Sequence, residues 1–268
     1  MNKERLKNHR AKNIDRYLTR GKDMTLIMGA KCINGIALIG DRKITIDSGA
    51  DYTYGDKLFA PLNTIVVGSS GLSGMYKSFQ NRVLMAIKQH QKEGMGVGAE
   101  ETLAIIEQIM HQMLSEYGES IMANGFDVLM AMRNTPEPEL NRIIYLGLPE
   151  PVIDYKCVGH GEPYASLLLK TLWKKDMSMM QFAKLGCFTI RFIENLNLDN
   201  SVGGLPQVYF IPKIQFDKTN PPTEQKEWDE LWEKYPIRQL KEEEIEYILQ
   251  STEHNITNIQ NMIKRISL

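Results

Sequence analysis

The chain has 268 residues, and at roughly 150 residues per domain this length predicts one large domain with an appended segment. Its 32 Lys and Arg against 33 Asp and Glu leave a net charge of −1, without the basic excess of a protein that binds nucleic-acid phosphates. The longest apolar stretch, residues 27–39, is interrupted by Lys31 and Asn34 and is shorter than the roughly 18 residues of a membrane span. We therefore expect no nucleic-acid partner and no membrane insertion.

Three cysteines, Cys32, Cys157 and Cys187, are spaced neither as metal ligands nor as a disulfide framework. Met1 is followed by a charged segment without an apolar region, so no secretory signal is predicted. These features favour a cytoplasmic protein in a reducing compartment, and they imply no metal and no organic cofactor. Residues 1–24 carry an excess of Lys and Arg, which we interpret as a solvated propeptide or N-terminal extension.

In chain order, the periodicity of apolar residues, and the Gly, Asn and Pro residues that mark turns between the periodic segments, predict grouped strands and paired helices. Asn34-Gly35 is the expected hairpin turn between the first two strands. The predicted elements are a strand-rich region over 24–70, helices over 72–92 and 99–117, strands over 126–132, 140–146 and 152–158, helices over 163–174 and 178–197, and a strand over 207–214. This grouping favours an α+β fold, with antiparallel sheets packed against helical layers, over a βαβ crossover fold.

After the last strand, Asn220-Pro221-Pro222 interrupts the pattern, and residues 224–234 and 241–264 are amphipathic. We interpret this part as a helical C-terminal extension. The predicted organisation is an N-terminal extension over 1–24, a main domain over 25–213 and the C-terminal extension over 214–268.

Thr25 opens the first apolar strand, and its chemistry would change if it were the first residue of the mature chain. A hydroxyl needs a base to become a nucleophile, and a free α-amine on the same residue, with a pKa of roughly 7.7–8.0, supplies one near neutral pH. Such a site also needs a cation that favours the neutral amine and a carboxylate that holds the cation. Lys57 and Asp41 are candidates for these two groups; the alternative is a surface ion pair that contributes little to stability.

Several short motifs accompany Thr25 along the chain. They are Thr25-Leu26-Ile27-Met28-Gly29, Asn34-Gly35, Gly40-Asp41-Arg42-Lys43, Thr45, Lys57-Leu58-Phe59, Ser70-Gly71, Val158-Gly159-His160-Gly161-Glu162-Pro163-Tyr164-Ala165 and Asp199-Asn200-Ser201-Val202-Gly203-Gly204. Together they resemble the proteasome β-type subunit family over residues 25–212, with the family's Gly, Asp, Lys and oxyanion-hole Gly falling on Gly35, Asp41, Lys57 and Gly71 without a gap.

The resemblance implies an α+β fold that is a four-layer αββα sandwich of the N-terminal nucleophile hydrolase type, and a threonine-type endopeptidase. By the family's pattern, Thr25 is the nucleophile and, through its α-amine, the base. Lys57 lowers the pKa of that amine and Asp41 orients Lys57. The Gly71 N–H donates into the oxyanion hole, and Asp199 helps to hold the threonine terminus.

The same resemblance implies where substrate lies. Thr45 would contact the substrate backbone, and Ile44, Phe59 and Ser69 would border the first specificity pocket. None of these pocket residues is charged, so we expect a preference for an apolar side chain in a peptide or unfolded protein. The family also implies a homo- or hetero-oligomeric ring.

Three features depart from the family's pattern. His160 stands where the family has a Ser, and Val202 stands where it has another, with Ser201 next to it. His160 could replace its Ser as a hydrogen-bond donor or acceptor, which would make activity depend on pH near the titration of the histidine. The third departure is Met24, at the position where many precursors have Gly.

Two routes to a free Thr25 follow from this last departure. The chain is a zymogen that cleaves itself between Met24 and Thr25, or Met24 is the start and an aminopeptidase removes it. If residues 1–24 stay attached, the mechanism is switched off. The departures motivate one alternative function, a non-catalytic structural subunit; a second is a peptide ligase, in which an amine resolves the acyl-enzyme on Thr25.

Overall fold

A computed structural model describes residues 25–46, 51–94, 97–133, 137–144, 147–216, 219, 222–223 and 225–266. The expected N-terminal extension over residues 1–24 lies outside the described residues. No helix in the described part of the chain combines the length and apolar character needed to cross a membrane.

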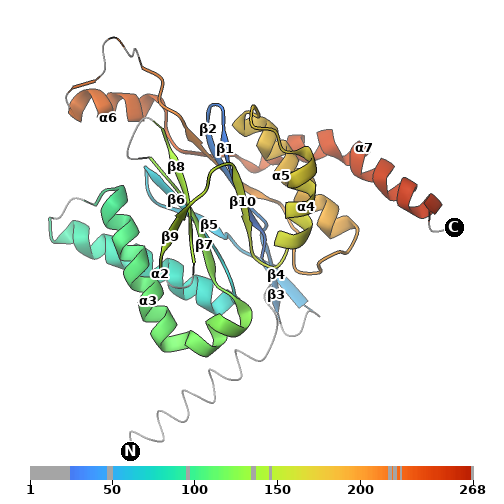
Figure 1. Cartoon of the computed structure of the whole chain (residues 1–268), viewed down its shortest axis with the longest axis horizontal. Helices are drawn as coiled ribbons and strands as arrows, with labels where there is room; N and C mark the ends of the chain where they lie inside the picture. Colours follow the sequence, from blue (N-terminus) through green and yellow to red (C-terminus); the bar gives the residue numbers. More distant parts are fainter. Residues whose placement is uncertain are drawn as a thin grey trace, which may run out of the picture.

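Two antiparallel sheets form the centre of the molecule (Figure 1). The β1 sheet has the order β10 (Tyr155–Val158), β1 (Ile27–Cys32), β2 (Gly35–Gly40), β11 (Gln207–Pro212) and β12 (Arg238–Gln239). The β6 sheet has the order β5 (Leu58–Leu62), β6 (Ile65–Ser70), β7 (Asp127–Met132), β8 (Glu139–Ile143) and β9 (Pro149–Pro151). A separate two-stranded ribbon pairs β3 (Lys43–Ile46) with β4 (Asp51–Tyr54).

Apolar side chains on the facing sides of the two sheets form a common core. Its members come from both sheets and include Ile27, Ile36, Leu38, Leu58, Val66, Leu129, Ala131 and Ile211. All six residues of β2 and of β6 are buried, because other residues cover both faces of these strands. Neighbouring residues of β2 and β6 therefore alternate between this core and the cores on the outer faces.

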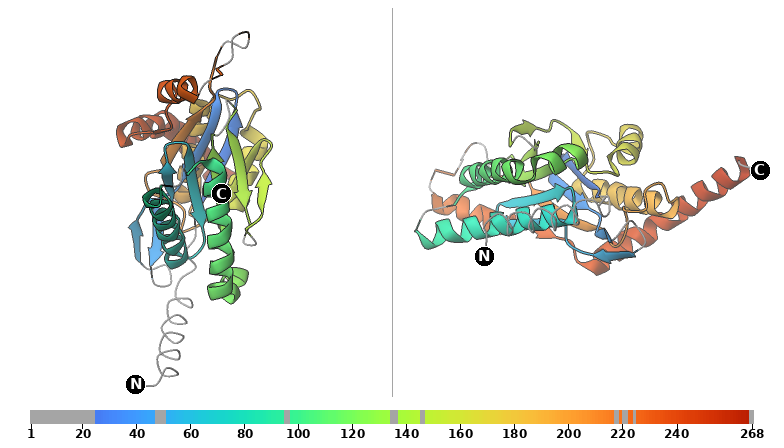
Figure 2. Two further views of the ribbon diagram at one scale, coloured as in Figure 1. Left: turned by 90° about the vertical axis from the view of Figure 1, so that its left-hand side faces the viewer. Right: turned by 90° about the horizontal axis from the view of Figure 1, so that it is seen from below.

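Helices pack against the outer face of each sheet (Figures 1 and 2). The α2 (Ser73–Lys92) and α3 (Ala99–Asn124) helices share an apolar cluster with the outer residues of the β6 sheet. On the other side, α4 (Glu162–Leu172), α5 (Met179–Asn195) and α7 (Glu242–Ile266) share a cluster with the outer residues of the β1 sheet. The short α6 (Gln225–Lys234) precedes β12.

The C-terminal segment packs against the main domain that starts at residue 25. The β12 strand pairs with β11, and Ile245, Ile248 and Ile256 of α7 are buried in the cluster that contains α5. Beyond this contact, α7 runs away from the rest of the molecule toward the C-terminus (Figures 1 and 2).

Most expected elements end within three residues of their predicted bounds, and three differences affect the architecture. The first hairpin turn lies at Ile33 and Asn34, one residue earlier than expected, because Gly35 already pairs with Cys32. The α3 helix continues to residue 124, past a non-helical Tyr117 with φ −128° and ψ 22°.

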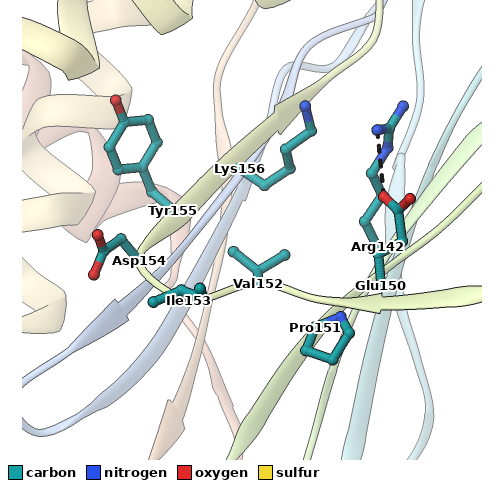
Figure 3. A pocket seen from close by; sticks show the side chains of 8 residues that line it. All are labelled: Arg142, Glu150, Pro151, Val152, Ile153, Asp154, Tyr155 and Lys156. Atoms are coloured by element: carbon teal, nitrogen blue, oxygen red, sulfur yellow. Dashed lines mark ion pairs between the residues drawn. The ribbon is translucent and has the colours of Figure 1, made fainter.

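The third difference is that the strand expected over residues 152–158 is divided between the two sheets. The β9 strand pairs with β8, and β10 pairs with β1. Residues 152–154 cross between the sheets and line an open depression beside the Arg142–Glu150 ion pair (Figure 3). Val152 points into the core between the sheets, which accounts for the apolar residue at this crossing.

Candidate active site

Four of the residues singled out from the sequence lie at the ends of strands. Thr25 lies just before β1, Asp41 follows β2, Lys57 precedes β5 and Gly71 follows β6. The pairings Ile27↔Gly40 and Leu58↔Gly68 place these ends next to each other within each sheet. The two sheets also meet there, because a Cβ built on Gly68 would lie 2.5 Å from Leu58 Cδ2 and 3.0 Å from Ile27 Cδ1.

Asp41 and Lys57 form a buried ion pair between the two sheets. Lys57 Nζ lies 2.8 and 2.9 Å from the two carboxylate oxygens of Asp41 and donates to the Lys43 carbonyl at 2.6 Å. The Leu26 N–H donates to Asp41 Oδ1 at 2.7 Å, and the Gly203 N–H donates to Oδ2 at 3.4 Å. The Asp41 and Lys57 side chains are 0% and 1% exposed, which excludes a surface ion pair.

The electrostatics of the pair have opposing contributions. Burial raises the pKa of the Asp41 carboxyl, while the Lys57 ammonium and the Leu26 and Gly203 N–H groups act to lower it. Placing two charges inside a protein costs several kcal/mol per ion unless hydrogen bonds and the partner charge compensate. The charged ammonium is therefore held at one place by its carboxylate and by a backbone carbonyl.

Thr25 is connected to the same region through its backbone. It is buried, and its carbonyl accepts a hydrogen bond from the Gly161 N–H at 3.3 Å. A Cβ built on Gly159 would lie 2.1 Å from the Thr25 carbonyl oxygen and 3.3 Å from Ser70 Cβ, and Gly159 has φ +98°. Only glycine fits there, so Gly159 brings Thr25 close to the end of β6.

Gly71 also occupies a position that excludes side chains. It has φ +135°, and a Cβ on it would lie 2.6 Å from the Phe126 ring. It directly follows Ser70, whose hydroxyl donates to the Asp127 carbonyl at 3.3 Å. Ser70, the residue before Gly71, and Thr25 both lie next to Gly159, so the turn after β6 is near the Thr25 backbone.

The residues expected at the specificity pocket lie on the outer side of the β6 sheet. Ile44 and Phe59 belong to the apolar cluster that contains Tyr76 of α2. Ser69 is buried on β6, and its Oγ has no hydrogen-bond partner among the described residues. Thr45 lies on β3 opposite Tyr52; its side chain lies outside the described residues.

Comparison with known proteins adds an independent finding. A family model described as proteasome subunit matches residues 23–200, which is more than half of the chain. The chain belongs to the proteasome subunit family. Proteasome subunits assemble into oligomeric rings, and the family includes threonine peptidases. No curated protein matches the chain.

The departures from the family's serines fall around Asp199. The Asp199 carboxylate is buried and accepts hydrogen bonds from the Ser201 N–H at 3.0 Å and from the Ser201 hydroxyl. Val202 is fully buried, and a Cβ on Gly161 would lie 2.8 Å from its Cγ2. Val202 therefore has a packing role, while the neighbouring Ser201 provides a hydroxyl to the carboxylate. His160 is half-exposed, and its Nδ1 lies 3.6 Å from Asp199 Oδ2.

Gly203 is a site residue that sequence reasoning did not assign. Besides donating to Asp41, it accepts hydrogen bonds through its carbonyl from the Arg42 and Lys43 N–H groups at 3.2 and 3.1 Å. The next residue, Gly204, donates to Glu194 Oε1 of α5 at 3.0 Å. The Gly-Gly pair before the last strand was the signal for this role in a proteasome subunit.

Among the described residues, no cluster of three His, Cys, Asp or Glu side chains has the arrangement of a metal site. The three cysteines are free thiols. The described site thus consists of hydroxyl, ammonium, carboxylate and backbone groups.

Proposed function

We propose that this proteasome subunit is a threonine-type peptidase that cleaves peptide bonds through an acyl-enzyme on Thr25, once its α-amine is free. The observation that supports this most is the fully buried Asp41–Lys57 pair, held by hydrogen bonds from Leu26 and Gly203 and to Lys43. Leu26 is the residue that follows Thr25, so the pair is attached to the backbone of the nucleophile itself.

The proposed reaction uses the groups of this chain in a defined order. The neutral α-amine of Thr25 accepts the hydroxyl proton as Oγ attacks the substrate carbonyl. The Gly71 N–H stabilises the oxyanion of the tetrahedral intermediate. The amine then gives its proton to the leaving nitrogen, and water releases the acyl group from Oγ. The Lys57 ammonium favours the neutral amine at the start, because a nearby positive charge lowers the pKa of an amine.

A non-catalytic structural subunit does not require the buried Asp41–Lys57 ion pair. Replacing a buried ion pair by apolar residues is often neutral or stabilising, so a chain that serves only for assembly gains nothing from keeping it. The packing of helices on the outer faces of two facing sheets supports the proposal in another way, because it fits a four-layer αββα sandwich of the N-terminal nucleophile hydrolase type.

The surroundings of Thr25 suggest further roles. Asp199, supported by Ser201, would hold the threonine terminus, and His160 would face the substrate side with its half-exposed ring. Ile44, Phe59 and Ser69 would receive the side chain before the cleaved bond, with Thr45 on the substrate backbone. An uncharged pocket formed by these residues would favour an apolar side chain, and Ser69 Oγ is a polar atom without a partner among the described residues.

The proposal extends to processing and assembly. Residues 1–24 would be a propeptide that the chain removes by cleaving itself between Met24 and Thr25. On the other route, Met24 would be the start, residues 1–23 an upstream extension, and an aminopeptidase would remove Met24. The mature chain would function in the cytoplasm in a homo- or hetero-oligomeric ring that acts on peptides or unfolded proteins. The organisation would be residues 1–24, 25–213 and 214–268, with the last segment packed on the main domain.

One observation favours a non-catalytic subunit as the second candidate. His160 Nδ1 is 3.6 Å from Asp199, which is too long for the hydrogen bond that the family's Ser would contribute. A peptide ligase remains an enzymatic variant of the first proposal, since an amine instead of water would then resolve the same acyl-enzyme. Accumulation of ligated product from two peptides would distinguish it from a hydrolase.

Covalent trapping tests the proposal. The purified protein is incubated with a peptidyl epoxyketone, which reacts with both the hydroxyl and the α-amine of an N-terminal threonine, and the adduct is located by peptide mapping. We expect an adduct on Thr25, none in Thr25→Ala, and unchanged assembly of that variant by native mass spectrometry. Peptidase activity in Thr25→Ala equal to the wild type would rule out the threonine mechanism.

A further inference from the structure

Gln207 is a polar residue in an apolar layer. It is the first residue of β11 and is 1% exposed. Its side chain lies on the side of the β1 sheet that faces the β6 sheet, where Ile211 of the same strand joins the core between the sheets. Burying an amide there is unfavourable unless its polar atoms form hydrogen bonds.

The Gln207 amide bonds to the backbone at the start of β5. Its Oε1 accepts from the Lys57 N–H at 3.1 Å and from the Leu58 N–H at 2.9 Å, and its Nε2 donates to the Leu58 carbonyl at 2.8 Å. Because β5 is the edge strand of the β6 sheet, no strand of that sheet bonds to this side of Leu58. The side-chain amide of Gln207 takes the place of a neighbouring strand.

Gln207 also lies beside the strand that leads to Asp41. In the β1 sheet Gln207 is paired with Gly40, the residue before Asp41. Through its backbone Gln207 therefore lies beside the strand end that carries the carboxylate, and through its side chain it binds the strand start that carries the ammonium. The two charged groups come from different sheets. The distance between them therefore depends on how the end of β2 and the start of β5 are held together.

We propose that Gln207 is a positioning residue for Lys57. Gln207 fixes the backbone of residues 57–58, so that the Lys57 ammonium stays at Asp41 beside Thr25. This inference rests on the proposed peptidase function for its catalytic consequence. Gln207 does not touch the reacting atoms; it acts through the Lys57 and Leu58 N–H groups. Without it, these two buried donors lose their acceptor and the start of β5 shifts, which moves the cation relative to the amine of Thr25.

Three variants separate positioning from general stability. Gln207→Met keeps the approximate length and volume of the side chain but removes all three hydrogen bonds. Gln207→Glu keeps an acceptor for both N–H groups. Val208→Ala is the matched control, because Val208 is fully buried on the same strand but faces the helices.

The measurement is the rate of Thr25 acylation by a β-lactone as a function of pH, with thermal stability measured in parallel. We expect the rate in Gln207→Met to fall roughly tenfold, less than the roughly 10²- to 10³-fold lost when an electrostatic group is removed outright, because Lys57 is displaced and not deleted. We also expect its pH midpoint to move upward, because a displaced cation lowers the pKa of the amine less. Gln207→Glu should recover part of the rate, and Val208→Ala should lose stability with an unshifted midpoint.

The charged groups around Lys57 that affect this midpoint come from several elements. They include Asp41 after β2, Lys43 of β3, Arg42 with its partners Asp56 and Glu242, and, at the Thr25 terminus, Asp199 with His160. Gln207→Met and Val208→Ala change none of these groups, so an upward shift in Gln207→Met that Val208→Ala lacks reports the position of Lys57. Gln207→Glu adds a carboxylate, which itself raises the pKa of a nearby amine, so its rate and not its midpoint is compared.

Two outcomes would overturn the proposal, and the second of them does so without reference to the peptidase function. The first is a Gln207→Met protein whose acylation rate and pH midpoint equal those of Val208→Ala at equal stability. The second uses hydrogen–deuterium exchange of the peptide that contains Lys57 and Leu58, where uptake no faster than in Val208→Ala would show that Gln207 does not hold this backbone. Failure of the wild type to acylate, with the exchange difference present, would contradict the proposed function alone.

Discussion

Lys57 shows how one side chain combines a structural and a chemical role. Its ammonium is bound by Asp41 and the Lys43 carbonyl, and its backbone N–H by Gln207. The residue types of Thr25, Asp41 and Lys57, together with the family resemblance, predicted these residues as a group, and the structure shows the ion pair between Asp41 and Lys57. Their burial and the contribution of Gln207 could not be predicted, because the contact between Lys57 and Gln207 joins residues 150 positions apart and depends on how two sheets face each other. For Gly203, the Gly-Gly pair was a signal that the sequence reasoning did not use.

Replacing Lys57 by Met leaves the Asp41 carboxylate buried without its counter-ion. We expect a loss of about 3 to 5 kcal/mol in the free energy of unfolding, together with loss of Thr25 acylation, because the cation near the amine is gone. The measurement is urea unfolding followed by circular dichroism. Lys156→Met is the control, since its ion pair with Glu162 is partly exposed and such pairs contribute up to about 1 kcal/mol.

Equal stability losses in Lys57→Met and Lys156→Met would contradict the buried-pair description. Lost acylation with no loss of stability would instead mean that the Asp41 carboxyl takes up a proton and stays buried as a neutral group without Lys57.

Alanine substitutions at Gly159 and Gly94 test the close contact between Gly159 and Thr25, with Gly94 as the control. Both have positive φ, +98° and +74°, but a Cβ on Gly94 meets nothing within 4 Å, while one on Gly159 would overlap the Thr25 carbonyl. We expect Gly94→Ala to cost about 1 to 2 kcal/mol from backbone strain alone. Gly159→Ala should cost at least about 1 to 3 kcal/mol more from steric overlap and should slow Thr25 acylation. Similar thermal stability and acylation in the two variants would refute the contact.

The three thiols should be unreactive in the native protein. Burial raises the pKa of Cys32, Cys157 and Cys187 from 9.0 to about 12, and the thiolate is the reactive form. We expect slow alkylation by iodoacetamide near neutral pH and rapid alkylation after denaturation, measured by mass spectrometry. Native alkylation as fast as that of the denatured chain would contradict these pKa directions.

The same thiols affect stability at alkaline pH. Their folded-state pKa values lie above 9.0, so the unfolded chain releases these protons first as the pH rises. Their contribution to stability is therefore complete below pH 9 and decreases above it.

At the scale of elements, α7 is the part whose position the sequence predicted least. Its amphipathic pattern was sufficient to predict a helix, and the helix forms over Glu242–Ile266. The pattern did not show that its apolar side packs in the same cluster as α5, or that β12 joins the β1 sheet. A helix's own periodicity identifies its buried face but not the element that covers it.

Neighbouring residues of α7 test this packing. Ile248 is 2% exposed and Tyr247 is 71% exposed. Ile248→Ala should lower the free energy of unfolding by about 2 to 5 kcal/mol through lost burial and a cavity, and Tyr247→Ala should change it by less than about 0.5 kcal/mol. Equal unfolding midpoints for the two variants would show that α7 does not pack on α5 in solution.

At the scale of the whole molecule, the order of strands and helices and the antiparallel pairing followed from local patterns, and the described elements confirm both. The crossing of residues 152–154 between the sheets was missed, because a continuous apolar run such as 152–158 does not show where a chain changes partners. The family match over residues 23–200 supports the resemblance drawn from short motifs. The proposed peptidase activity depends on a free terminus at Thr25. The partners in a ring depend on other chains.

The central claim, that Thr25 is the nucleophile of a mature chain, depends on a free α-amine at that residue. The most direct measurement is the intact mass and N-terminal sequence of the purified protein expressed from the full chain. Our account predicts a chain that begins at Thr25. A protein that still begins at Met1 after assembly, and that cleaves peptides nonetheless, would contradict it.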